Sequence, residues 1–129
     1  MSFLQTEAIG ILSITDNVDM QTDQKNDLYT CPQGKVAYPC AVIICNPSAT
    51  LAGGTDYDFG CGDNCDTWRQ TVDLSSMTTA NTDFMVIRGA DVTKYTRMSA
   101  ADVFGIKPSN GSTGAATATV IVLGIEQDA

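Results

Sequence analysis

The sequence has no histidine and few basic residues. Seven Lys and Arg stand against fifteen Asp and Glu among 129 residues, for a net charge of -8. Without histidine there is no Ser-His-Asp triad and no histidine general base. P-loop and dinucleotide-binding motifs are absent too. The sequence does not exclude a pair of catalytic carboxylates, although acidic residues scattered over a surface form such pairs by chance. We therefore predict that the chain is not an enzyme and uses no cofactor.

The shortage of positive charge also limits the classes of molecule that the chain is expected to bind. A chain this acidic has little with which to displace phosphate counterions, so we predict no nucleic-acid partner. Anionic membranes are disfavoured for the same reason. The longest apolar runs, AVIIC and VIVLGI, are too short to cross a bilayer. The first ten residues lack the features of a secretion signal. We expect synthesis in a cytoplasm, where thiols stay reduced.

Helical periodicity is almost absent, and alternating apolar residues indicate short strands. The expected strands, in chain order, cover residues 8–14, 27–31, 35–46, 57–59, 67–74, 83–89, 93–98, 101–108 and 115–126. In the last of these both alternating sets become apolar, as in a strand buried on both faces. We predict one all-β domain over residues 1–129, an antiparallel β-sandwich of jelly-roll type. An immunoglobulin-like sandwich is the alternative.

Residues 1–26 form a distinct N-terminal part in this prediction. A first strand over residues 2–14 precedes the most polar stretch of the chain, residues 15–26. We interpret that stretch as a surface loop or mobile segment. The first strand could then act as an arm that pairs with a neighbouring subunit, through Phe3, Leu4, Ile9 and Ile11.

The stretch LYTCPQGKVAYPCAVIICNPS, residues 28–48, predicts two strands joined as a hairpin. Pro32 and Gly34 are the expected turn residues, because Pro fixes φ and Gly accepts a positive φ. Pro39 lies inside the second strand, where it cannot donate to a ladder. It therefore indicates a bulge, a bend or a sheet edge.

Five cysteines raise the question of a metal site or a disulfide. No C-x-x-C pair occurs, so the spacing does not fit zinc. Cys61 and Cys65 are the pair near enough in sequence for a local disulfide. For the other three we predict small side chains that mostly pack in or beside strands: Cys31, Cys40 and Cys45.

The loop around residues 51–67 carries the remaining candidates. Four aspartates lie close together there, as calcium ligands often do: Asp56, Asp58, Asp63 and Asp66. Their order is not that of an EF-hand, and the alternative is a solvated acidic loop. Tyr57 and Trp68 could form a sugar-stacking platform, although such rings more often fill a sandwich core.

Several segments of the chain resemble small structural proteins of tailed phages. The first has the pattern Leu-Tyr-Thr-x-Pro-x-Gly-Lys, followed by a strand that ends in Asn-Pro-Ser, within residues 28–48. The others are LAGGTDYDFGCGDNCDTWRQTVDLSSMT, YTRMSAADVFGIKP and ATATVIVLGI. The resemblance covers residues 28–125, and its motifs are structural rather than catalytic.

This resemblance implies a virion component. A capsid decoration or cement protein, bound to the major capsid protein and trimeric on the outer shell, is the first expectation. A neck, tail or fibre-associated virion protein is one alternative. A carbohydrate- or calcium-binding β-sandwich module is the other.

Overall fold

A computed structural model of the chain describes residues 8–91, 94 and 97–129, and these form eight β-strands and no helix. No helix in this part of the chain could therefore span a membrane. The strands are β1 (Gly10–Asp19), β2 (Asn26–Thr30), β3 (Lys35–Cys45), β4 (Asp56–Gly60), β5 (Arg69–Val72), β6 (Phe84–Arg88), β7 (Val103–Asn110) and β8 (Thr117–Asp128).

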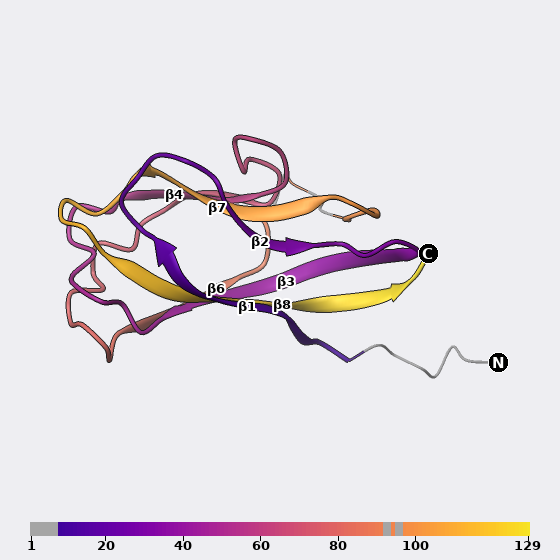
Figure 1. Ribbon diagram of the computed structural model, residues 1–129, viewed down its shortest axis with the longest axis horizontal. Helices are drawn as coiled ribbons and strands as arrows, with labels where there is room; N and C mark the ends of the chain where they lie inside the picture. The colour runs from indigo at the N-terminus through magenta and orange to yellow at the C-terminus, as the bar shows by residue number, and fades with distance from the viewer. Residues whose placement is uncertain (1–7, 92–93, 95–96) are drawn as a thin grey trace.

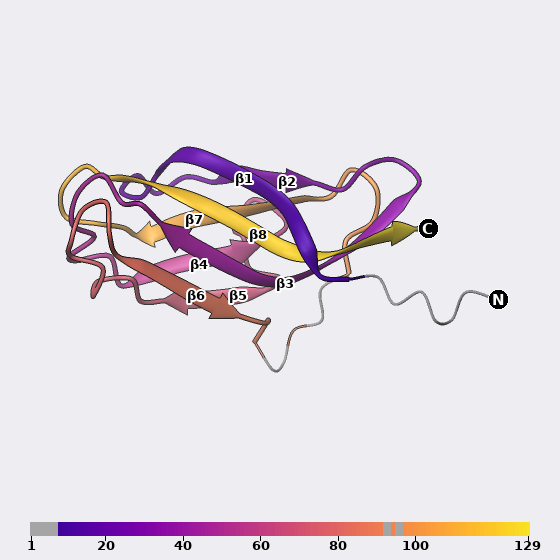
Figure 2. The same ribbon diagram turned by 90° about the horizontal axis from the view of Figure 1, so that it is seen from below.

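The strands form two four-stranded sheets, in the orders β1-β8-β3-β6 and β2-β7-β4-β5. Figures 1 and 2 show the two sheets stacked as a sandwich. The antiparallel partners are β1 with β8, β2 with β7, β3 with β6 and β4 with β5. The first strand thus pairs with the last, the second with the seventh, the third with the sixth and the fourth with the fifth, which is the jelly-roll arrangement. It confirms the predicted fold class and differs from the immunoglobulin order.

The core lies between the two sheets and is centred on one tryptophan. Trp68 is 1% exposed and packs edge-to-face against Phe59 and Phe104, with ring centroids 6.4 and 5.5 Å away. Its indole N–H donates to the carbonyl of Pro39, 3.0 Å away in the opposite sheet. Because the register between β3 and β8 shifts between Pro39 and Ala41, this carbonyl belongs to a bulge. The bulge predicted at Pro39 is therefore present.

The segment around Pro32 and Gly34 is a turn but not a hairpin. Lys35 N–H donates to Pro32 O at 3.2 Å, and Gly34 has φ of 75°. This hydrogen bond makes Pro32 the first of the four residues of a β-turn, so Gln33 and Gly34 occupy its two central positions. β2 and β3 belong to different sheets, so the turn carries the chain across the core. The hairpin prediction was therefore wrong. A tight turn can join two strands of different sheets as well as two paired strands of one sheet, so the turn residues do not distinguish these cases.

The polar stretch at residues 15–26 is more ordered than its composition predicts. Residues 15–19 continue β1, which pairs with β8 as far as Thr117. Val18 and Met20 are buried in the core, and β2 begins at Asn26. The expected loop is thus confined to residues 20–25. Phe3 and Leu4 lie outside the described residues.

Replacing the central tryptophan tests this account of the core. Trp68→Ala should lower the free energy of unfolding by about 3–5 kcal/mol, since it removes a large buried aromatic side chain. Trp68→Phe should cost less, about 1–3 kcal/mol, because it mainly leaves the Pro39 carbonyl unpaired. Urea denaturation measures both changes, with the exposed Thr30→Ala as control. A cost below about 1 kcal/mol for Trp68→Ala would contradict the central role of this ring.

Candidate functional site

The two outer faces of the sandwich differ in chemistry. On the sheet β2-β7-β4-β5, Tyr57, Phe59, Phe104 and Ile106 point into the core and are fully buried. The residues that alternate with them point outward, and they include Asp58, Lys107 and Ser109. Asp58 and Lys107 are direct neighbours in the register of β4 and β7. This face has the apolar-in, polar-out pattern of a sheet that meets water.

Asp58 is a structural carboxylate on that polar face. It is 8% exposed and accepts hydrogen bonds from the Thr71 N–H at 2.9 Å and the Ser109 hydroxyl at 2.6 Å. It thereby joins β4 to both of its neighbouring strands. Thr71 has φ of 58°, so Asp58 satisfies a backbone group in an irregular part of β5.

Asp56 lies beside Asp58 and is the less well satisfied of the two carboxylates. Its Oδ1 atom is buried and has no hydrogen-bond partner. Burial raises the pKa of Asp56, and the hydrogen bond and charge of Asp58 and the charge of Asp23 raise it further, against Lys107. The fold therefore favours the protonated form of Asp56.

The other two aspartates predicted as calcium ligands lie in the exposed turn that follows β4. Asp63 and Asp66 are exposed, whereas Asp56 and Asp58 are on the strand itself. Within residues 8–91, 94 and 97–129, no three Cys, Asp or Glu side chains are grouped so that they could hold a metal ion. The structure thus does not bring the four aspartates together.

The aromatic pair predicted as a sugar platform is inaccessible. Tyr57 has no exposed surface, and its hydroxyl donates to Met20 O at 2.7 Å. Burial raises the pKa of Tyr57 to about 12. Trp68 is 1% exposed. Because stacking on a sugar needs an open ring face, this platform is wrong and both rings serve the core.

All five cysteines are free thiols. Cys31 and Cys65 are buried, whereas Cys40, Cys45 and Cys61 are half-buried. Burial raises the pKa of Cys31, Cys40 and Cys61, and it raises that of Cys65 to about 11. Raised pKa values disfavour the reactive thiolate. Cys61 and Cys65 carry no bridge in this structure, and the alternative of a local disulfide between them is decided by thiol titration.

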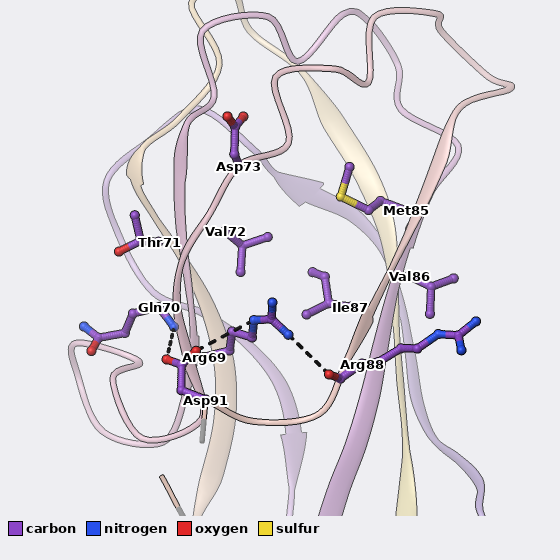
Figure 3. A pocket seen from close by; sticks show the side chains of 10 residues that line it. All are labelled: Arg69, Gln70, Thr71, Val72, Asp73, Met85, Val86, Ile87, Arg88 and Asp91. Atoms are coloured by element: carbon purple, nitrogen blue, oxygen red, sulfur yellow. Dashed lines mark hydrogen bonds and ion pairs between the residues drawn. The ribbon is translucent and has the colours of Figure 1, made fainter. Parts of the chain in front are cut away.

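A groove of about 500 Å³ lies between β5 and β6, the edge strands of the two sheets (Figure 3). Arg69 closes one end. Its Nη1 donates to Arg88 O at 3.2 Å, and its Nε lies 3.8 Å from Asp91 Oδ1. Asp91 Oδ2 in turn accepts the Gln70 N–H at 3.1 Å. These polar contacts tie the two sheet edges together, which gives the side chains of Arg69 and Asp91 a structural role.

The outer face of the sheet β1-β8-β3-β6 is apolar. The strand register places one row across all four strands, namely Ile14, Ile121, Ile43 and Val86. The next row contains Ile11, Leu123, Ala41 and Arg88. A third contains Thr119, Cys45 and Phe84. We call these three rows the outer apolar face. Its most exposed members are Phe84 at 67%, Ile11 at 61% and Ile14 at 57%.

Of the predicted arm residues, the structure describes Ile9 and Ile11. Both are 61% exposed, but Ile11 belongs to β1 and pairs with Leu123 of the same chain. Sequence reasoning missed the other members of the outer apolar face. The sequence signal for this face was the last strand, β8, in which the residues that point inward and the residues that point outward are both apolar.

Comparisons with known proteins yield a likeness in structure but none in sequence. No protein-family model matches the sequence, and no curated protein matches it. A solved structure described as "Capsid of Ralstonia phage GP4" is similar, with 14% identity and a TM-score of 0.48, over 94% of this chain and 85% of that one. A likeness this low does not assign a function.

The pH dependence of stability tests the state of Asp56. Because its folded-state pKa is raised, its contribution to stability is full below about pH 4 and is lost as pH rises through the folded pKa. Asp56→Asn mimics the neutral form and should raise Tm at pH 7 by about 2–4 °C. The difference from wild type should shrink toward pH 3. Asp63→Asn, at an exposed position, is the control. A lower Tm for Asp56→Asn at pH 7 would refute this reading.

Thiol titration tests whether the five cysteines are free and which of them are accessible. Under denaturant we expect five reactive thiols per chain. In the native protein near pH 8, the buried Cys31 and Cys65 should be protected, because access is blocked and the thiolate is disfavoured. A count of three or one under denaturant would instead reveal disulfides. Mass spectrometry after alkylation identifies the residues involved.

Proposed function

We propose that this chain is a structural component of a tailed-phage virion that decorates the outer capsid shell and stabilises it. The observation that carries the proposal is the extent of the sequence resemblance, which covers residues 28–125. That range contains the strands from β3 to β7 entirely and most of β2 and β8. The resembling motifs therefore correspond to the framework of the sandwich rather than to a single loop.

The physical character of the fold supports this role by analogy. Jelly rolls are frequent in viral shells, although they also occur in lectins and enzymes. The most suggestive aromatic pair for sugar binding, Tyr57 and Trp68, is buried. A net charge of -8 suits a protein on the outside of a shell better than one in contact with packaged DNA.

The partner in this proposal is the major capsid protein, and the resemblance implies a trimer on the shell. The predicted arm covered residues 2–14, but residues 10–14 belong to β1, so residues 2–9 are the part that stays a candidate for attachment. Deleting residues 1–20 would not isolate the arm. That deletion would remove an edge strand together with the buried Val18 and Met20.

Counting copies in purified virions tests the proposal. A decoration protein should be present in hundreds of copies per particle, measured by quantitative mass spectrometry against the major capsid protein. It should also bind purified shells that lack it. A few to a few dozen copies would indicate a neck, tail or fibre protein. Absence from the virion would refute the proposal.

The same binding assay tests the arm. Phe3→Ser with Leu4→Ser should weaken shell binding, because an apolar arm contact loses both side chains, and a Tm measurement on the same variant separates this from a loss of fold. Gln5→Ser with Thr6→Ser is the matched control. Equal binding by both variants would exclude an apolar arm contact.

A further inference from the structure

The outer apolar face lacks the pattern of a sheet that meets water. Along β8, Val120 and Val122 point inward and are fully buried, while Ile121 and Leu123 point outward. An antiparallel sheet with a wet face normally alternates apolar with polar residues, as the opposite sheet of this sandwich does. The outward isoleucines contribute nothing to the core of one chain. Their presence implies an apolar partner surface.

The size of this face is close to what a specific contact needs. Four strands about 4.8 Å apart and three rows about 6.6 Å apart span roughly 19 by 20 Å, or about 400 Å² in projection. Exposed apolar patches of this size are often interaction sites. Two such faces pressed together would cover roughly 800 Å² in projection. The accessible area lost would be larger because side chains protrude, and it would approach the lower limit of about 1,200 Å² for stable interfaces.

Charge makes a second copy of this chain a suitable partner. Two chains of net charge -8 repel each other over most of their surfaces. The three rows contain one cation, Arg88, and the exposed Asp16 lies at the β1 end of the third row, where it accepts the Thr119 hydroxyl. This apolar face carries one charge of each sign, so two copies can approach there with little repulsion. Such a contact is self-complementary, as a twofold interface requires.

Two opposite charges lie at diagonal corners of the face. Arg88 is on the edge strand β6, in the row of Ile11. Asp16 is on the edge strand β1, where it accepts the Thr119 hydroxyl at 2.8 Å beside the row of Phe84. A twofold axis across this diagonal would place Asp16 of each copy over Arg88 of the other. The strands would then cross at roughly 90°, one of the two common sheet packings.

We infer that this chain forms a twofold dimer in which the outer apolar faces of two copies pack against each other, with Asp16 and Arg88 paired at the rim. The row of Ile14, Ile121, Ile43 and Val86 lies at the centre of the contact. The dimer is a state of the free protein in solution and needs no virion, whereas the trimer that the resemblance implies is a state on the shell. A failure of this inference therefore leaves the shell-binding experiment unaffected.

Sedimentation equilibrium of the full chain, from about 1 to about 100 µM, tests the inference. Wild type should approach the mass of a dimer. Ile14→Lys and Val86→Lys should each weaken association about 10-fold or more, because each buries an unpaired charge. Both side chains are exposed in the single chain, at 57% and 38%, so the fold should tolerate them. Circular dichroism melts check this. Thr30→Lys, exposed on the other sheet, is the matched control and should leave the dimer intact.

A charge exchange tests the orientation of the two copies. Arg88→Asp should weaken the dimer, and combining it with Asp16→Arg should restore it. A wild-type chain that stays monomeric at every concentration would overturn the inference and leave the face to the capsid protein. A trimer would overturn it as well, because a face-to-face twofold contact closes at two copies. A dimer that ignores both lysine substitutions would place the interface elsewhere.

Discussion

The contact between Trp68 and Pro39 is the interaction on which the sandwich depends. The indole ring comes from the residue just before β5 in one sheet, and the carbonyl comes from β3 in the other. Pro39 removes a ladder hydrogen bond and so produces a bulge, and the bulge frees a carbonyl that the tryptophan then satisfies. One polar contact thus sets the position of the largest core side chain. The rings of Phe59 and Phe104 pack around it.

Jelly-roll topology separates the two outer faces and allows each its own chemistry. The polar face is held together by side chains such as Asp58, which joins β4 to β5 and β7. The apolar face is built mainly from isoleucine, leucine, valine and phenylalanine, with the hydrogen bond between Asp16 and Thr119 at one corner. Burial of this second face against another chain would add a hydrophobic contribution that a single sandwich cannot obtain. The fold therefore combines a closed core with a surface suited to assembly.

The acidity of the chain has consequences for such an assembly. Mutual repulsion keeps copies apart except where charges of the two signs balance. The rows across β1, β8, β3 and β6 carry one charge of each sign, Asp16 and Arg88, so repulsion between copies is weak there. A protein whose copies attract each other through one face assembles in a defined orientation rather than aggregating.

Much of the fold followed from the sequence alone. Alternating residues located the strands, Pro39 indicated the bulge, and the absence of histidine excluded most catalytic arrangements, because these are local properties of chemistry and backbone geometry. The tertiary structure decided which strands pair. Pro32 and Gly34 predicted a turn but could not show that it crosses between sheets, since both paths use the same backbone conformation. Likewise, the double apolar pattern of residues 115–126 indicated two covered faces. Only the stacking of the two sheets showed that one chain covers the first and leaves Ile14, Ile43, Ile121 and Val86 on the outside, because burial depends on neighbours far apart in sequence.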